Sequence, residues 1–434
     1  MLDRRRFLGA LGLPPAAALG SCSSVDRCRA KRAIEALRGE DRPAEDVARD
    51  ESFWREVQLA FSVDRSMVNL NNGGVSPSPS FVHEKYQQHL AYANQAPPYH
   101  MWRIQEPHKE PVRQRLARFL DCDPEEVAIT RNASESLMVC QHGIDLEPGD
   151  EVLTTNQDYP RMRNAFAQRA RREGISVREI SLPGPDAGDD EVVEAFARAI
   201  TDRTRLLLCC HVINLTGRIL PVRAIARMAR DRGVQVIVDG AHAVAHFPFS
   251  LGELECDYYG TSLHKWLFAP IGTGLLHVRR DRIGSLWPLF SANEGQRDDI
   301  RKFEEIGTHP AACILAIAEA LTFHETLGPD RKLARLVYLR DRWCRRLLEN
   351  DRVRLHTSLE PGRAGGIATV EIEGIEPCAL NSHLWQRYRI LTTPIAHAEF
   401  RGIRVSPSVY TTIEEIDRFA DAMERVARNG LPSA

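Results

Sequence analysis

The chain has 434 residues, of which 43% are hydrophobic and 27% charged, with a formal net charge of −2 at pH 7. This length and balance predict a globular protein with one large domain and a smaller appended one, and they exclude a disordered or fibrous chain. Because the charge is nearly neutral, we expect no nucleic-acid partner.

The first 25 residues predict an export signal. Arg4-Arg5-Arg6-Phe7-Leu8 opens an apolar, Gly- and Ala-rich stretch that runs to Gly20, a pattern similar to twin-arginine signals, which export folded proteins. The stretch is too short and too often broken by Gly and Pro to span a membrane. We therefore expect a periplasmic location, with a frayed basic N-terminus as the alternative.

The residues after this signal predict a second location and a linker. Leu19-Gly20-Ser21-Cys22 resembles a lipoprotein cleavage site, and lipidation of Cys22 would tether the protein to a membrane. Residues 26–50 are charged and are expected to form a linker, and residues 51–75 an N-terminal segment. The ten cysteines lack metal-site spacing, so we expect no metal site.

Strand-like runs alternate with helical patterns in the middle of the chain. The runs expected as strands are 127–130, 151–154, 176–180, 205–212, 234–239 and 274–278, and helices are expected at 190–199 and 222–232. Repeated strand–helix–strand order predicts an α/β fold with a mostly parallel sheet covered on both faces. We assign this large domain to residues 76–310.

The last third of the chain predicts a smaller α+β domain, residues 311–434. Helical patterns at 311–327 and 331–348 come first. A strand at 367–372, a helix at 377–388, a short strand at 403–405 and a closing helix at 413–426 are expected to follow.

Lys265 is the residue that most strongly indicates chemistry. It lies in Thr261-Ser262-Leu263-His264-Lys265-Trp266, shortly after an apolar run that ends in Asp239. A lysine amine can form a Schiff base, the serine and histidine before it can hold a phosphate, and a carboxylate can keep a pyridine nitrogen protonated. The pattern predicts an enzyme that uses pyridoxal 5′-phosphate (PLP); a surface lysine before an amphipathic tryptophan is the alternative.

Residues that suit the same cofactor follow the other expected strands, at the sheet edge where ligands of open α/β sheets bind. Asn132-Ala133-Ser134 opens a helix whose free amides can bind an anion, and Tyr159 can stack on a flat ring. Asn214 can offer a polar group, and a buried Asp239 needs a cation such as a protonated pyridine. His242 follows close behind. Taken singly, each has an ordinary alternative: a helix cap, a packing residue, a loop, a turn cap or a core histidine.

Taken together, these turns resemble the class V aminotransferase family of fold-type I PLP enzymes, which includes cysteine desulfurases, kynureninases and isopenicillin-N epimerase. The resemblance spans residues 69–410, and its most specific parts are Asp239-Gly240-Ala241-His242 and Ser262-Leu263-His264-Lys265-Trp266. It implies a mostly parallel, seven-stranded sheet in the large domain, PLP as the cofactor and a homodimer.

The resemblance also implies roles for individual residues. Lys265 would form the Schiff base and carry protons, Asp239 would pair with the pyridinium, and Thr308 would reach the phosphate of the neighbouring subunit. The residues implied to bind the cofactor are Asn132, Ala133, Ser134, Tyr159, Asn214, Asp239, His242, Ser262, His264, Lys265 and Thr308.

Three further residues are implied on the substrate side. Arg404 resembles the arginine that binds the substrate α-carboxylate, a task that suits its planar, two-pronged donor. Asn72 and Gly73, in Asn71-Asn72-Gly73-Gly74-Val75, match the family's N-terminal substrate loop. The alternatives are a surface arginine on a strand and an asparagine that only sets a turn.

The reaction is left open among epimerase, aminotransferase and lyase, acting at the α-carbon of an amino acid or a peptide-like metabolite. The overall pattern is nearest the isopenicillin-N-epimerase-like branch, and residues 392–400 lack the cysteine that desulfurases need, although cysteine or selenocysteine lyase-like chemistry is an alternative. With its export signal, the chain also resembles periplasmic enzymes that tailor peptide siderophores. An alternative of another class is a non-catalytic PLP-fold binding or sensing protein.

Overall fold

The computed structural model describes residues 40–432. The expected export signal, the Cys22 lipidation site and the first part of the expected 26–50 linker lie outside these described residues. From residue 40 onward, the short helix α3 (Ala44–Val47) contacts α15 (Pro329–Leu347), and Val47 is fully buried. In this part of the chain, no helix is both long enough and apolar enough to cross a membrane.

A seven-stranded sheet forms the centre of the larger part of the molecule, with strand order β2-β8-β7-β6-β5-β3-β4. Only β8 runs antiparallel to its neighbours, so the predicted α/β fold with a mostly parallel sheet is confirmed. The strands are β2 (Val127–Thr130), β3 (Glu151–Thr155), β4 (Ser176–Ile180), β5 (Thr204–Cys210), β6 (Gln235–Asp239), β7 (Tyr258–Ser262) and β8 (Gly274–Val278).

Helices cover both faces of this sheet. Successive side chains of a strand point to opposite faces, so the apolar strands present side chains to be buried on each face. On β6, Ile237 belongs to the core cluster of α8 and α9, whereas Val236 and Val238 belong to that of α7, α10, α11 and α14. Burial on both faces explains why the strands are apolar throughout rather than alternating. These helices are α7 (Lys109–Leu120), α8 (Ala133–Gly143), α9 (Pro160–Glu173), α10 (Asp189–Ala199), α11 (Val222–Arg230) and α14 (Ile317–Leu327).

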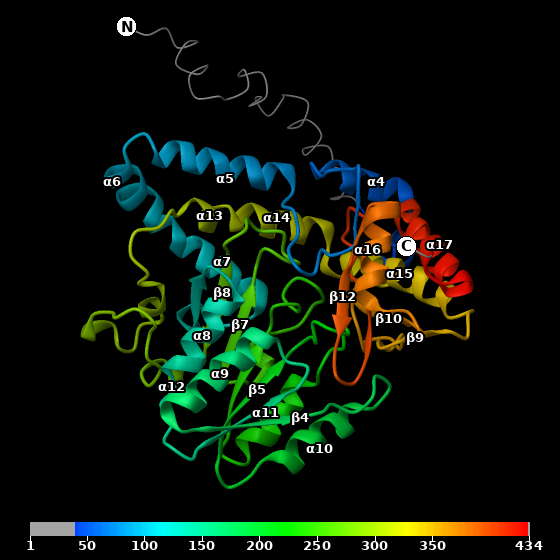
Figure 1. Ribbon diagram of the computed structural model, residues 1–434. Helices are drawn as coiled ribbons and strands as arrows, with labels where there is room; N and C mark the ends of the chain where they lie inside the picture. The colour runs from blue at the N-terminus through cyan, green and yellow to red at the C-terminus, as the bar shows by residue number, and fades with distance from the viewer. Residues whose placement is uncertain (1–39, 433–434) are drawn as a thin grey trace, which may run out of the picture.

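A four-stranded antiparallel sheet, β12-β13-β10-β9, packs with the C-terminal helices at one end of the large sheet (Figure 1). Helix α15 links the two parts, because Leu336 belongs to the core of the large sheet and Trp343 to that of the small one. The elements are β9 (Val353–Leu355), β10 (Ala368–Ile372), β12 (Thr393–Ala396), β13 (Arg401–Val405), α16 (Pro377–Tyr388) and α17 (Ile413–Asn429).

The N-terminal segment joins this end of the molecule. Helix α4 (Glu51–Leu59), blue in Figure 1, lies beside the C-terminal helices, and the short strand β1 (Val68–Asn69) pairs in parallel with β11 (Ile390–Leu391). Helix α5 (Ser80–Ala93) then contacts α13 (Ala312–Leu315) and α14. The N-terminal segment therefore pairs with β11 in a separate two-stranded sheet and then packs, through α5, on the helices α13 and α14.

The structure differs from the expected elements in several places, since β9 and β12 of the small sheet and helices α5, α7 and α9 were not among them. The helix expected at 311–327 is divided into α13 and α14, and β7 was not among the expected strands. Gly260 weakens the strand signal of β7, yet a Cβ at this position would lie 2.8 Å from Leu137 Cγ on α8. The glycine that obscures the strand in the sequence is therefore what lets the helix pack against it.

We expect Gly217→Ala to lower the free energy of unfolding by about 3 kcal/mol or more. Gly217 has φ +79°, and a Cβ there would lie 2.2 Å from the Ile367 carbonyl oxygen, at the contact between the two sheets. Gly233→Ala is the matched control: its φ is +71° but no atom lies within 4 Å, so we expect a loss of only about 1–2 kcal/mol. Urea denaturation measures both; equal losses would contradict the steric explanation.

Candidate active site

The turns after several strands of the large sheet meet at the carboxyl edge of that sheet. The Ala133 amide, after β2, donates to Ser262 Oγ at the end of β7, at 2.9 Å. Lys265 Nζ, after β7, lies 3.2 Å from His242 Nε2, after β6. Parallel strands bring their carboxyl ends to one edge, so residues far apart in the sequence form one cluster.

Lys265 and Asp239 are ionisable groups of opposite sign in this cluster. Burial lowers the pKa of Lys265 to about 8, although the nearby Asp239 carboxylate opposes this shift. Burial raises the pKa of Asp239 to about 6, with Asp158 adding to the rise and the Ala241 amide, which donates to Asp239 Oδ1 at 3.0 Å, opposing it. Near neutral pH, Lys265 is therefore partly the free amine that an aldehyde requires.

His242 lies between Lys265 and the tryptophan that follows it in the chain. The indole Nε1 of Trp266 donates to His242 Nδ1 at 3.4 Å, which leaves Nε2 toward Lys265. Burial lowers the pKa of His242 well below its ordinary value, with the Lys265 and Arg404 charges adding to the shift. His242 is therefore a neutral ring beside the lysine amine.

The first turn of α8 forms an anion-binding geometry. Asn132 caps the helix by accepting the Glu135 amide at Oδ1, at 2.9 Å. A Cβ on Gly274 would lie 2.6 Å from the Asn132 backbone, so glycine is what allows β8 to begin against this turn. The positive end of α8 and the Ser262 hydroxyl together suit a phosphate group.

Two further expected phosphate ligands lie around this turn. Ser134 is half-buried in the first turn of α8, and His264 bonds the Thr273 carbonyl oxygen through Nδ1 at 3.1 Å. Burial lowers the pKa of His264, so this ring is neutral as well. The hydrogen bond holds the imidazole in the turn that carries Lys265.

Arg404, on β13, is a buried cation that lacks an acidic partner. Only 7% of it is exposed, and within residues 40–432 no carboxylate forms an ion pair with it. It donates to Asn71 Oδ1 at 2.7 Å and to the Asn214 carbonyl oxygen at 3.1 Å, while its Nε and Asn214 Oδ1 are buried without a partner. Burial lowers the pKa of Arg404 to about 10. A carboxylate would satisfy these groups with a two-pronged hydrogen bond.

The loop after β1 contacts this arginine through a residue that the sequence reasoning missed. Asn71 bonds Arg404, whereas Asn72 is fully buried and uses its amide internally, donating to the Ser406 carbonyl oxygen at 3.2 Å and accepting from the Tyr410 hydroxyl at 2.5 Å. Two adjacent asparagines carry no signal that distinguishes them. The parallel bridge between Asn71 and Ser406 decides which side chain faces the site.

The same loop also reaches the lysine turn. The Ser76 amide donates to the His264 carbonyl oxygen at 3.1 Å, and the Gly73 amide donates to Ser406 Oγ at 2.9 Å. A Cβ on Gly73 would lie 3.4 Å from His242 Cε1. The loop therefore lies directly beside the histidine of the cluster.

Tyr159 is the N-cap residue of α9, directly before Pro160, and is 37% exposed at this edge of the sheet. Asp158 before it is buried, and it accepts the Thr155 and Cys210 amides at 2.8 Å each. These bonds tie the turn that carries Tyr159 to the end of β5. The sequence reasoning assigned no function to Asp158; an acid in the turn that follows a buried strand was the only signal.

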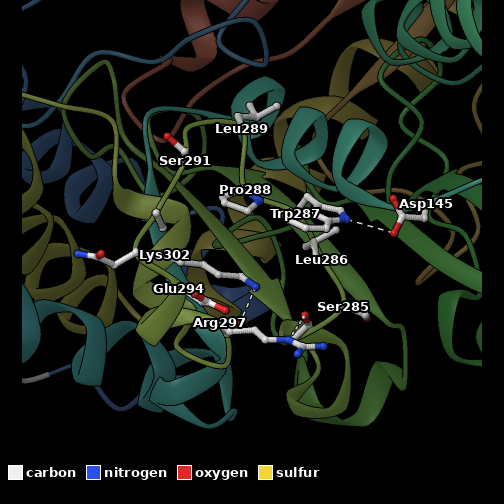
Figure 2. Close-up of a pocket in the computed structure, with 13 residues that line it drawn as sticks. Asp145, Ser285, Leu286, Trp287, Pro288, Leu289, Ser291, Glu294, Arg297 and Lys302 are labelled. Carbon is white, nitrogen blue, oxygen red and sulfur yellow. Dashed lines mark hydrogen bonds between the residues drawn. The ribbon is translucent and has the colours of Figure 1, made fainter.

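Thr308 lies apart from the Lys265 cluster. It is exposed beside Gly307, in a segment held by Lys109, whose Nζ lies 3.3 Å from His309 Nε2. A separate cavity of about 900 Å³ borders residues 284–302, where Trp287 donates to Asp145 Oδ2 at 3.1 Å (Figure 2). No residue of the Lys265 cluster lines that cavity. In the described part of the chain, no group of His, Cys, Asp or Glu side chains is arranged to hold a metal ion.

Comparisons with known proteins identify the family that this chain resembles. A model of the family "Aminotransferase class-V" matches residues 68–419. Isopenicillin N epimerases of Streptomyces clavuligerus and Amycolatopsis lactamdurans are each 32% identical to this chain, over 86% of it and 98% and 99% of the relatives. A cysteine desulfurase of Haloferax volcanii is 27% identical, over 73% of this chain and 78% of the relative.

Two solved structures share the fold. The cysteine desulfurase CsdA of Escherichia coli superposes with a TM-score of 0.75 at 21% identity, covering 87% of this chain and 99% of that one. A C-DES mutant with glycine covalently linked to its PLP cofactor superposes with a TM-score of 0.74 at 23% identity, covering 84% and 99%. At these identities the likeness establishes the fold.

We expect Asp239→Asn to raise the free energy of unfolding of the cofactor-free protein by about 1–3 kcal/mol at pH 7.5. The folded-state pKa of about 6 lies above the ordinary aspartate value, so the charged carboxylate is disfavoured in the folded protein. This penalty is complete above pH ~6 and disappears as the pH falls below ~4, so the gain should shrink over that range. Urea denaturation at several pH values measures it.

Asp257→Asn is the matched control. Asp257 is also 5% exposed, but it pairs with Arg279 and Arg282 at 2.9 and 3.0 Å, so its replacement should lower the free energy of unfolding. If Asp239→Asn also lowers stability at pH 7.5, then Asp239 is already compensated by a cation.

Proposed function

The chain belongs to the class-V aminotransferase family, and from this premise we propose that it acts at the α-carbon of an amino acid or a peptide-like metabolite, with Lys265 as the residue that links the cofactor and carries protons. Family membership and the PLP-bound structural neighbour imply PLP as the cofactor. The observation that carries the proposal is that a lysine with a depressed pKa, a buried aspartate and an arginine without an acid partner lie at one edge of the sheet.

The side chains present fit PLP. The Lys265 amine suits its aldehyde, Asp239 suits its pyridine nitrogen, and the first turn of α8 with Ser262 suits its phosphate. Tyr159 and the neutral His242 are the rings that would flank it. When bound, PLP supplies a sink for the electron pair that is left when a bond at the α-carbon breaks.

The residues of the chain then have separate tasks. The Lys265 amine, with a pKa of about 8, can accept the α-proton and return it at Nζ near neutral pH. Arg404 binds the α-carboxylate, and Asn71 and the Asn214 carbonyl orient its guanidinium through their hydrogen bonds. The charged carboxylate of Asp239 would be favoured by a protonated pyridine nitrogen that faces it. The carboxylate would in turn keep the pyridine nitrogen protonated.

Epimerisation is the reaction that the relatives favour, since two isopenicillin N epimerases match nearly their whole length. Aminotransferase and cysteine or selenocysteine lyase chemistry are the alternatives within the family. A desulfurase would need a thiol in the hairpin between β12 and β13. In this hairpin, Glu399 instead accepts hydrogen bonds from the side-chain amides of Asn156 and Gln157 at 2.6 and 3.2 Å. That hairpin is therefore tied to the turn before Tyr159.

We also propose a homodimer with shared sites and a periplasmic location. Thr308 is exposed and apart from the Lys265 cluster, as expected of a residue that completes the site of a second copy. Support for export comes from the sequence alone: the arginine-rich start of residues 1–25 for the twin-arginine route, and Cys22 for a lipid anchor. A peptide siderophore is one member of the peptide-like substrate class.

We expect purified wild-type protein to show the visible absorbance of lysine-bound PLP and Lys265→Ala to lose it. Wild-type protein incubated in D2O with a panel of amino acids and peptides should also incorporate deuterium at the α-carbon of its substrate. Chiral analysis and assays for keto acid and sulfide then separate epimerase, aminotransferase and lyase.

Two outcomes would count against this function. Wild-type protein that contains no PLP and does not take it up refutes the cofactor. PLP-loaded protein that exchanges no α-proton and releases no product with any compound of the panel favours a binding or sensing protein instead.

We expect Arg404→Gln to weaken the apparent affinity for a substrate amino acid by about 10- to 150-fold, the range for a lost charge-assisted hydrogen bond. Wild-type protein should prefer the free acid over its carboxamide, and the variant should lose this preference while keeping PLP. Arg401→Gln is the matched control, since Arg401 is exposed on the same strand. Spectral titration gives the affinities; an unchanged preference in Arg404→Gln excludes Arg404 as the carboxylate ligand.

A further inference from the structure

We propose that Lys332 is a positioning residue that holds the turn carrying Lys265 in its working geometry, an inference that rests on the proposed role of Lys265. Lys332 lies in the first helical turns of α15, and none of it is exposed. Its Nζ donates to the carbonyl oxygen of Trp266, the residue after Lys265, and lies 4.0 Å from the centroid of the Phe268 ring. Both contacts are to the turn that carries Lys265.

Lys332 is an unusual side chain to bury. Within residues 40–432, no carboxylate forms an ion pair with it, and burial lowers its pKa well below the ordinary lysine value. An unpaired buried ammonium is strongly disfavoured, whereas a neutral amine can still donate to a carbonyl group. The Trp266 carbonyl oxygen, in turn, obtains a donor that water cannot supply at this depth.

The turn that Lys332 contacts has a strained backbone. Phe268 has φ +62°, in the left-handed region that bulky side chains rarely adopt, and its ring is only 1% exposed. Two backbone hydrogen bonds close the turn. The Leu263 amide donates to the Thr273 carbonyl oxygen at 3.0 Å, and the Ala269 amide donates to the Leu263 carbonyl oxygen at 3.1 Å. Such a conformation persists only where its surroundings hold it.

Trp266 transmits this restraint to the cluster. Its indole stacks on His246, with ring centroids 3.8 Å apart and an angle of 12° between the planes, and it donates to His242 Nδ1. His246 is itself fixed, because Nδ1 bonds the His242 carbonyl oxygen at 2.8 Å and Nε2 accepts the Gly366 amide at 2.7 Å. A shift of the Trp266 backbone would therefore move both Lys265 and its histidine neighbour.

Lys332 acts only through these contacts. The titratable and charged groups that face Lys265 are Asp239, His242, His264, Cys210 and Arg404. Among the described residues, no hydrogen bond joins any of them to Lys332. The expected effect of losing Lys332 is therefore a displaced Lys265 with an intact carboxylate site.

Lys332→Met tests this, because methionine has a similar length and no donor. In the cofactor-free protein, we expect the amides of residues 263–269 to exchange with D2O about tenfold faster. With PLP present, we expect about tenfold weaker PLP affinity, and about fivefold slower α-proton exchange per PLP-loaded site at saturating amino acid. The affinity for the amino acid should stay within about twofold, since Arg404 is untouched.

Lys302→Met is the matched control. Lys302 is 4% exposed and donates to the Ile283 and Arg297 carbonyl oxygens at 2.6 and 2.7 Å, so it is also a buried lysine bound to backbone. It does not contact the Lys265 turn. We expect Lys302→Met to lose stability but to keep wild-type amide exchange at residues 263–269 and the wild-type rate per PLP-loaded site.

Phe268→Leu is the second variant, in case Lys332→Met does not fold. It removes the ring under the amine but keeps the hydrogen bond, so we expect faster amide exchange confined to the same segment and a slower rate per loaded site. The inference is overturned if either folded variant matches Lys302→Met, or if faster amide exchange spreads evenly over the chain. Wild-type protein without PLP would instead contradict the proposed function, which separates the two failures.

Discussion

The site depends on ionisable side chains that the fold buries without a partner of opposite charge in contact. Asp239 ends a strand that is covered on both faces, so its pKa rises to about 6, and burial also lowers the pKa of Arg404 to about 10. Each shift shows that burial disfavours the charged form of the side chain in the folded protein. A ligand with a cationic nitrogen and a carboxylate would relieve both at once, which is why the same groups that destabilise the folded protein suit the proposed binding of an amino acid on PLP.

The two sheets have different tasks in this arrangement. The large sheet supplies the residues proposed to bind the cofactor, because its parallel strands end at one edge. The small sheet supplies Arg404, and several contacts bring it there: the Gly217 turn lies against Ile367, the Thr357 and Thr369 hydroxyls donate to the Thr216 and Leu215 carbonyl oxygens, and Arg404 bonds the Asn214 carbonyl oxygen. Helix α15 packs in both cores and carries Lys332 under the Lys265 turn. The geometry of Arg404 relative to Lys265 is therefore set by the contacts between the two parts.

Several parts of this arrangement could be predicted from the sequence, and others could not, for identifiable reasons. The fold class and most strands of the large sheet could be predicted from the sequence, because buried strands are short apolar runs bounded by turns. Strand β7 could not be predicted, because Gly260 weakens its strand pattern. The reason for this glycine, the close approach of α8, is visible only in the tertiary structure. Asn71 could not be distinguished from Asn72, because a bridge to Ser406, more than three hundred residues away, decides which faces Arg404.

The sequence by itself determined most of the strands along the chain and the chemical groups that follow them, and therefore that Asp239 and the first turn of α8 share an edge. Lys265 was expected beside them from its motif, since its strand, β7, was not among the predicted strands. The shared edge could be predicted because local patterns locate the strands along the chain, and parallel strands end at the same edge of a sheet. Only the tertiary structure decided which side chains are left without partners and which hold others in place, as Asp158 and Lys332 do. Burial and hydrogen-bond partners are properties of long-range packing, and no local pattern encodes them.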